Sequence, residues 1–462
     1  MPKCNNRFSL KALAAAVSAT VALGVVALPT LSHADETACS PFTPLIKGQE
    51  DLVYVWTLGV EGIGDGSDKL VTVDVRPGSK TFGKVINSLS VGGRGEAHHM
   101  GFSDDRRYMW AGALDSNKMF VFDIGTDPSK PKLVRTITDL VEKTGYVGPH
   151  TFYALPGRMM IQALSNAKDH GGVTGIAVYS NDGKFISKHD MPTTKVGGVQ
   201  GDGYGYDIGI NPQKNVLLTS SFTGWNNYMM DLGKMVKDPD AMKHFGNTMA
   251  MWNLKTMEPM KVFDVPGAPL EIRWSLKKGD NWAVTATALT SQLYVIKQDK
   301  NGEWQSHDVA TIGNPADIPL PVDISITADG KGLWVNTFMD GMTRYWDFHD
   351  PMHPKEVFKE KIGSQVNMVS QSFDGKRVYY TTSLLGNWDK KGKDDEQFLK
   401  MYKWNGKKLS HVFTIDFYKE KLGRAHHMKF QALNLSKLKP LASAESQDLD
   451  SLKLALTEPK GK

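Results

Sequence analysis

The sequence predicts an all-β fold, a seven-bladed β-propeller closed by N-terminal strands that pair with the C-terminal innermost strand. Two observations lead to this prediction, a repeated strand unit and an incomplete unit at each chain end. Each repeat starts at a polar residue, runs through a short apolar strand, and reaches a turn before a second strand. The starts recur at roughly fifty-residue spacing, at His98, His150, Asp207, Glu271, Asp323, Asn367 and His426.

The second strand of each repeat is the next element that the sequence predicts. Apolar and β-branched residues dominate after each turn, which is typical of a buried strand. These runs cover residues 107–114, 158–164, 216–222, 282–289, 332–338 and 377–383. A third strand and a turn to a fourth follow, most clearly at 121–123 and 345–347. Four such strands make one blade.

The two chain ends are expected to complete the seventh blade. Three strands near the N-terminus have no innermost strand before them, at residues 52–58, 70–75 and 84–89. The run 426–432 is an innermost strand with nothing after it. Pairing these segments removes the sheet edges that an open array would leave for aggregation. Closure places His426 in the blade beside that of His98, with His150 in the next, so three consecutive blades direct histidine to the axis.

The N-terminal residues 1–34 are predicted to be a secretory signal peptide. Three basic residues precede the apolar stretch 12–28, and small residues at Ser32 and Ala34 suit cleavage after Ala34. A retained membrane anchor is the alternative, although the apolar stretch is short for a span. We expect the mature protein to be exported to a bacterial periplasm, with no membrane attachment after cleavage.

Composition excludes several classes of protein. Lys and Arg total 55 against 50 for Asp and Glu, and loss of three basic residues with the leader makes the balance nearly even. This charge gives no case for nucleic-acid binding. Only Cys39 of the two cysteines follows the leader, so no internal disulfide is expected. The sequence contains no Gly-rich phosphate loop before a helix, no Ser-centred nucleophile elbow and no paired-cysteine zinc pattern.

Two insertions interrupt the propeller domain predicted for residues 35–435, one at 224–247 and a second, a polar loop expected to be solvated, at 389–397. The insertion 224–247 contains four methionines, and its residues 231–244 have plausible helical spacing. A helical flap packed by adaptable methionines is one interpretation. A copper-delivery face is the other, because thioethers bind Cu(I). The tail 436–462 lies outside the blade pattern.

Two His-His-Met triplets carry the candidate chemistry, at 98–100 and 426–428. Neighbouring side chains of a strand point to opposite faces, so one histidine of each pair should face the axis unless the strand is bulged. The repeat register favours His98, with His99 as a further candidate ligand. Together with His150 and either His426 or His427, these imidazoles predict a metal centre. An exported all-histidine site suits copper.

Carboxylates occupy the equivalent starts of three other blades, at Asp207, Glu271 and Asp323. They are candidate catalytic residues, because a carboxylate near a metal can orient a ligand or accept a proton from a substrate. The alternative is a structural role, in which they bond to strand amides or to Arg273. Glu96, two residues before His98, is a further candidate to orient an imidazole.

The chain resembles the selenium-binding protein family, and within it the bacterial members that oxidise methanethiol. The matching stretches are 96–99, 269–273, 323–326, 374–379, 381–383 and 388–389. The resemblance implies a copper-dependent enzyme that converts methanethiol, O2 and water to formaldehyde, hydrogen sulfide and hydrogen peroxide. It also implies that the family's histidines fall on His98, His99, His150 and His426, while the role of His427 stays open. The animal members' selenium-associated cysteine has no counterpart in the strand 53–58.

Two other classes of function remain open from the sequence. One is a non-enzymatic periplasmic propeller that binds copper or another ligand, for which the methionine-bearing insertion is the best support. The other is a protein-interaction scaffold, since fold alone does not determine function. The partners expected for the enzyme are a small thiol and O2, and a homo-oligomer is left open.

Overall fold

The computed structural model describes residues 40–275, 277 and 279–439. The chain divides into the units Met1–Ser32 and His33–Lys462, and the first lies wholly outside the described residues. The predicted signal peptide 1–34 and residues 440–462 of the predicted tail therefore lie outside this range. Among the described residues, no helix has the length and apolar character that a membrane crossing requires.

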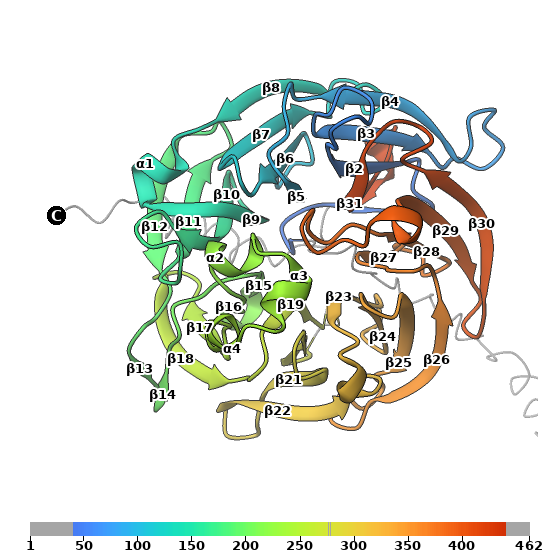
Figure 1. Cartoon of the computed structure of the whole chain (residues 1–462). Helices are drawn as coiled ribbons and strands as arrows, with labels where there is room; N and C mark the ends of the chain where they lie inside the picture. The colour runs from blue at the N-terminus through green and yellow to red at the C-terminus, as the bar shows by residue number, and fades with distance from the viewer. Residues whose placement is uncertain (1–39, 276, 278, 440–462) are drawn as a thin grey trace, which may run out of the picture. The chain divides into compact units, whose positions relative to one another are not determined.

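Seven four-stranded antiparallel sheets surround a central axis, which confirms the predicted propeller (Figure 1). From the axis outward, blade one consists of β5 (Ala97–Phe102), β6 (Tyr108–Ala113), β7 (Lys118–Asp123) and β8 (Lys132–Ile137). Blade two consists of β9 (Tyr146–Leu155), β10 (Arg158–Asn166), β11 (Gly175–Ser180) and β12 (Phe185–Asp190). Blade three consists of β15 (Ile208–Asn211), β16 (Val216–Thr219), β17 (Thr248–Asn253) and β18 (Glu258–Asp264). Blade four consists of β19 (Pro269–Trp274), β20 (Trp282–Thr287), β21 (Gln292–Gln298) and β22 (Trp304–Thr311). Blade five consists of β23 (Pro321–Ile326), β24 (Gly332–Thr337), β25 (Met342–Asp347) and β26 (Lys355–Lys361). Blade six consists of β27 (Val369–Gln371), β28 (Arg377–Thr381), β29 (Phe398–Trp404) and β30 (Leu409–Asp416).

Short elements connect or cover the blades. They are the strand pairs β1 (Leu45–Ile46) with β32 (Leu438–Lys439) and β13 (Lys195–Val196) with β14 (Val199–Gln200), and the helices α1 (Leu140–Thr144), α2 (Trp225–Tyr228), α3 (Leu232–Met235) and α4 (Pro239–Lys243). Four 3-10 turns complete the described secondary structure, at Pro212–Lys214, Pro315–Asp317, Gly392–Asp394 and Leu435–Lys437.

The strands differ by their distance from the axis. Every residue of β5, β19 and β23 is buried, whereas the outermost strand β26 alternates exposed and partly buried residues. Lys355, Lys359 and Lys361 occupy three of the four exposed positions of β26, with Val357 at the fourth, and charges on an edge strand discourage pairing with another molecule. The innermost strands, with their polar residues, are therefore buried around the axis, while the charged outermost strand faces solvent.

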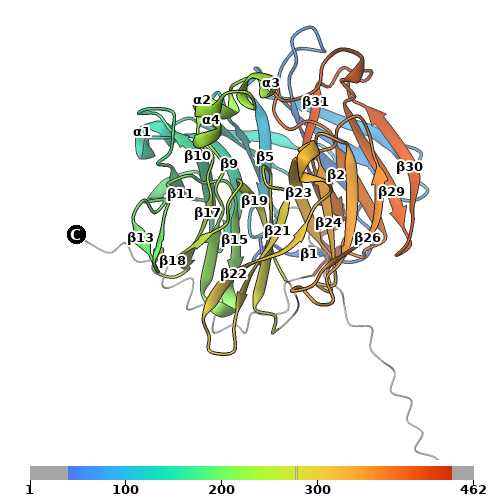
Figure 2. The ribbon, with the colours of Figure 1, turned by 60° about the horizontal axis from the view of Figure 1, so that its bottom comes forward.

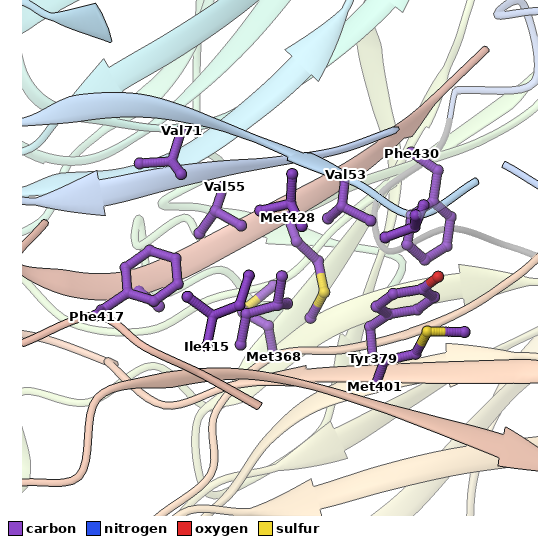
Figure 3. Packing of buried hydrophobic residues seen from close by; sticks show 14 of the residues in the cluster. Val53, Val55, Val71, Met368, Tyr379, Met401, Ile415, Phe417, Met428 and Phe430 are labelled. Atoms are coloured by element: carbon purple, nitrogen blue, oxygen red, sulfur yellow. The ribbon is translucent and has the colours of Figure 1, made fainter. Parts of the chain in front are cut away.

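The seventh blade closes the ring as predicted. Its order is β31 (Arg424–Gln431), β2 (Leu52–Leu58), β3 (Lys69–Asp74) and β4 (Lys84–Ser90), so the C-terminal strand is innermost. Val53 pairs with Phe430 and Val55 with Met428. Figure 3 shows these side chains packed against Tyr379 and neighbouring residues of blade six. Burial of this cluster joins the two ends of the chain through the core.

Register shifts interrupt the innermost strands where the predicted site residues lie. They occur in the pairs β5–β6, β9–β10, β31–β2, β19–β20 and β23–β24. In β5 the shift falls between Ala97 and Met100, which leaves His98 and His99 out of the regular ladder. A bulge relaxes the strict alternation of side chains. Both histidines of a pair can therefore turn toward the axis.

Different segments cover the two ends of the axis. The insertion forms α2, α3 and α4 at one end, and β1 lies near the other (Figure 2). The indole of Trp388 donates to the Met230 carbonyl at 3.1 Å, which fastens the insertion to the loop after β28. Met235 of α3 is fully buried, while Met242 is 37% exposed. The helical flap expected from the sequence is thus present, with its methionines largely in packing contacts.

Candidate metal centre

Five histidines converge on the axis from three adjacent blades. They are His98 and His99 of β5, His150 of β9, and His426 and His427 of β31, and all five are buried. The ring centroids of His98 and His426 lie 4.0 Å apart, and those of His99 and His150 lie 4.1 Å apart. His427 stacks on His99 with centroids 4.6 Å apart. Closure of the ring therefore assembles the histidines that the sequence predicted would meet.

Hydrogen bonds to one ring nitrogen determine which nitrogen of His426 and His150 can bind a metal. His426 Nδ1 lies 2.6 Å from the Ser383 carbonyl, which only accepts, so Nδ1 carries the proton. His150 Nδ1 lies 3.0 Å from Thr151 Oγ1, whose own hydroxyl donates to Tyr206 O or to Asp207. In both rings the lone pair is thus left on Nε2, the arrangement that a metal ligand needs.

His427 is bonded in the opposite sense. The Met100 backbone N–H donates to His427 Nδ1 at 2.9 Å, so the neutral ring carries its proton on Nε2. That nitrogen has no lone pair to offer a metal while the ring is neutral. The contact joins β5 to β31 and sets His427 against His99.

The electrostatics of the cluster keep the imidazoles neutral. Burial lowers the pKa of His98, His99, His150 and His427 well below the usual value, and neighbouring rings lower it further. Burial lowers the pKa of His426 to about 3. Each ring also has one nitrogen without a hydrogen-bond partner among the described residues, Nδ1 in His98 and His99 and Nε2 in the other three.

These features together test whether a metal fits the site. Ligand atoms of His98, His99 and His150 lie within 4.8 Å of one another. A buried polar atom without a partner costs free energy, and a cation among neutral imidazoles supplies the missing interaction. The donor set therefore fits a transition metal that prefers nitrogen ligands.

The predicted carboxylates form a second cluster around Arg273. Its guanidinium lies 3.3 Å from Asp207, 3.1 Å from Glu271 and 3.3 Å from Asp323. Asp207 also accepts from the Ile272 N–H, and Asp323 accepts from the Val369 N–H at 2.6 Å. Asp207 and Asp323 thus make the strand and arginine contacts that were the structural alternative for them.

Glu271 is placed differently from the other two carboxylates. Its Oε1 has no hydrogen-bond partner among the described residues and lies 3.7 Å from His99 Nε2. Burial and the adjacent Asp207 raise the pKa of Glu271 well above its usual value. A protonated carboxyl group beside the histidines can donate its proton and, once ionised, accept one in return. Glu96, by contrast, bonds to Arg94 and to the Gly386 N–H rather than to an imidazole.

Sequence reasoning missed three residues that hold the histidines. Tyr206 packs on His150 with ring centroids 4.1 Å apart. Ser383 supplies the carbonyl that orients His426, and Asn367 donates to the same carbonyl at 2.6 Å. Asn367 stands at a repeat start, so its position in the repeat could have predicted that it lies near the axis. Tyr206 and Ser383 lie outside that register and gave no such signal.

An apolar pocket adjoins the histidines at His98. Its lining includes His98, Tyr206, Phe222, Leu270, Val322 and Trp388. Phe222 and Trp388 meet edge to face with centroids 5.8 Å apart. Phe245, just after α4, also lines the pocket, so the insertion contributes to its cover. The histidine cluster therefore borders the apolar pocket through His98 and the acidic cluster through His99.

Comparisons with known proteins agree with this architecture. The family described as "56kDa selenium binding protein (SBP56)" matches residues 32–436. A methanethiol oxidase of Hyphomicrobium sp is 68% identical over 413 residues, covering 89% of this chain and 94% of the relative. A methanethiol oxidase of Ruegeria pomeroyi is 60% identical over 411 residues, covering 87% of this chain and 94% of the relative.

A solved structure supports the fold alone. The X-ray structure of a hypothetical selenium-binding protein from Sulfolobus tokodaii superposes with a TM-score of 0.73 at 23% sequence identity. The match covers 85% of this chain and 97% of that chain. Taken with the family match over most of its length, these similarities show that the chain belongs to the selenium-binding protein family.

Proposed function

We propose that this protein is a copper-dependent methanethiol oxidase. It would convert methanethiol, O2 and water to formaldehyde, hydrogen sulfide and hydrogen peroxide. The observation that carries the proposal is the convergence of five buried, neutral imidazoles, each with an unpartnered nitrogen. The two methanethiol oxidases at 68% and 60% identity support the class, an oxidoreductase that takes a sulfur donor and oxygen.

His98, His99, His150 and His426 are the proposed copper ligands. Two of them already have the lone pair directed by hydrogen bonds, His150 through Thr151 and His426 through Ser383. When bound, copper would supply a Lewis acid that lowers the pKa of a thiol and a redox centre that exchanges electrons with oxygen. His427 would position His99 through ring stacking rather than bind the metal.

The reaction balances as a two-electron oxidation. The methyl carbon of methanethiol loses two electrons and its C–S bond, and water supplies the oxygen of formaldehyde. The sulfur leaves as hydrogen sulfide, and O2 gains the two electrons and two protons to become hydrogen peroxide. The protein must therefore bind a small thiol, admit water and move protons near sulfur and oxygen.

Glu271 is the proposed proton-transfer residue. It is the carboxyl group of the acidic cluster that faces the histidines with a free oxygen, and its raised pKa keeps a proton on it. From this position Glu271 would give a proton to the departing sulfur or to reduced oxygen and recover one from the thiol or from water. Asp207 and Asp323 would instead hold Arg273 and the neighbouring strand amides in place.

The proposal is tested with purified mature protein. Copper content is measured, methanethiol is added, and oxygen consumption is followed together with formaldehyde, sulfide and peroxide, which should form in equal amounts. His98→Ala should lose copper and activity together. Full copper content and full activity in His98→Ala would contradict the proposed site.

The alternative of a non-enzymatic copper-binding propeller predicts a different result in the same experiment. Stoichiometric copper without oxygen consumption in the presence of small thiols would favour it. The packing of Met235 in the core leaves the insertion with less thioether surface for copper delivery than the sequence suggested.

Export to a periplasm is proposed on the leader alone. The basic start, the apolar stretch and Ala34 favour cleavage before Asp35. Expression of the full chain in a bacterium, followed by cell fractionation and N-terminal sequencing of the product, tests this. A product in the cytoplasm that retains residues 1–34 would exclude it.

A further inference from the structure

The apolar pocket beside His98 is small as well as enclosed. Apart from Leu289, its lining residues are buried. The space open to the centre of a water-sized sphere is about 10 Å³. That volume accommodates about one water-sized group. A methyl group is close to this size, whereas each additional carbon would require a wall residue to move.

The strands that form the pocket also form the acidic cluster. On β19, Leu270 lines the pocket and the next residue, Glu271, reaches Arg273. On β23, Val322 lines the pocket and Asp323 reaches the same arginine. In β5, His98 lines the pocket, while its neighbour His99 lies beside Glu271. On each of these three strands, one residue therefore lines the apolar pocket and the next lies in or beside the acidic cluster around Arg273.

The aromatic wall of the pocket, which limits its size, is tightly packed. Phe222 contacts Tyr206, Phe245 and Trp388 through edge-to-face ring pairs with centroids 5.3 to 5.8 Å apart. Trp388 is held by its bond to the Met230 carbonyl. Tight packing of this kind resists the displacement that a longer chain would demand. The pocket therefore has few ways to enlarge.

We propose that this pocket binds the alkyl group of the thiol substrate and restricts the enzyme to one-carbon thiols, with Val322 and Ala288 as specificity-determining residues. The inference rests on the proposed thiol oxidase function. An apolar group leaves water when it enters the pocket, while the sulfur faces His98. Since no charged side chain lines the pocket, thiols with a charged substituent would be rejected as well.

Enlarging the pocket is the first test. Rates with methanethiol, ethanethiol and 1-propanethiol are compared for the copper-loaded wild type and for Val322→Ala. The wild type should discriminate against each added methylene by about 10–200-fold in kcat/KM, the range that one methylene commonly produces. Val322→Ala should raise the ethanethiol to methanethiol ratio of kcat/KM about tenfold, because the removed methyl groups make room for the added carbon.

Val335→Ala is the matched control. Val335 lies on β24 of the same blade, is equally buried, and packs in the blade core away from the pocket. It loses the same two methyl groups and should keep the wild-type ratio. Filling the pocket with Ala288→Leu should lower kcat/KM for methanethiol at least about tenfold with copper content unchanged.

Binding to the metal-free protein provides a readout independent of turnover. Dimethyl sulfide, which has methyl groups and no acidic proton, is titrated and followed by ligand-observed saturation-transfer NMR. Its dissociation constant should rise in Ala288→Leu and stay at the wild-type value in Val335→Ala. A dissociation constant that is unchanged in Ala288→Leu would overturn the pocket assignment.

The outcomes separate the two proposals. If the copper-loaded wild type oxidises no thiol, the proposed function fails. If it oxidises methanethiol but Val322→Ala and Ala288→Leu both keep the wild-type preference among thiols, the pocket inference alone is wrong.

Discussion

At the scale of single residues, two adjacent histidines show how a hydrogen bond assigns a role. His426 donates from Nδ1 to a carbonyl, and His427 accepts at Nδ1 from a backbone N–H. Neutral imidazole has one lone pair, so the first ring presents it at Nε2 and the second does not. The two side chains are chemically identical and adjacent in the sequence. His426 is nevertheless a proposed ligand, and His427 is a proposed positioning residue.

This difference predicts unequal effects of two alanine substitutions. His426→Ala should lose stoichiometric copper after dialysis, because it removes a lone pair aimed at the site. His427→Ala should retain copper with affinity lowered about 10–100-fold, as for residues that support a ligand. Atomic absorption and competition with a chelator measure both. Equal copper loss in the two variants would contradict the assignment.

Glu271 gives a second prediction at this scale. Glu271→Gln preserves the size of the side chain and its neutral state but cannot transfer a proton. We expect kcat to fall about 10²–10⁴-fold, the usual contribution of a general acid or base, with copper content unchanged. Glu96→Gln is the control, since that carboxyl group contacts Arg94 and Gly386 instead. A Glu271→Gln enzyme with wild-type kcat would exclude the role.

At the scale of elements, the limits of sequence reasoning have physical causes. Blade order and closure could be predicted, because strand repeats and unmatched ends are visible in the chain. The direction of His99 and His427 could not be predicted, because it depends on bulges in β5 and β31 that only the paired register reveals. The pocket also escaped prediction, since residues such as Leu270 and Val322 look like ordinary core.

An ion pair between the N-terminal segment and blade six gives a prediction about element packing. Glu50 accepts from Arg377 at 2.6 and 2.8 Å and from Tyr379, and it is fully buried. Glu50→Ala leaves the guanidinium with Asp374 alone. We expect a loss of about 3 kcal/mol in the free energy of unfolding, measured by denaturant titration.

A surface pair serves as the control for this substitution. Asp182 pairs with Lys184 in solvent, so Asp182→Ala should leave the unfolding midpoint unchanged. If Glu50→Ala and Asp182→Ala have the same midpoint, the contact between the N-terminal segment and blade six contributes nothing measurable to stability.

At the scale of the whole molecule, ring closure couples folding to the state of the histidines. The unfolded chain protonates histidine near pH 6.5, whereas the folded His426 has a pKa of about 3. Below pH 6.5 the unfolded state takes up protons that the folded ring excludes. The contribution of His426 to stability is therefore present above that pH and is lost as the pH falls toward 3.

The coupling is measurable in metal-free protein. Between pH 6.5 and 5, the wild type should lose about 2 kcal/mol more unfolding free energy than His426→Gln. The comparison with the variant is needed because carboxyl groups with raised pKa, such as Glu96 at about 7 and Asp68 at about 6, act in the opposite direction. Parallel pH profiles for the two proteins would show that His426 titrates normally.

The position of β31 at the end of the chain has a consequence for biogenesis. A ribosome that has not yet translated residue 426 has produced a polypeptide with only three of the four proposed ligands and a gap in the ring. Prematurely terminated products share that defect. If the four proposed ligands are all needed, metal capture would follow the synthesis of β31 and its pairing with β2.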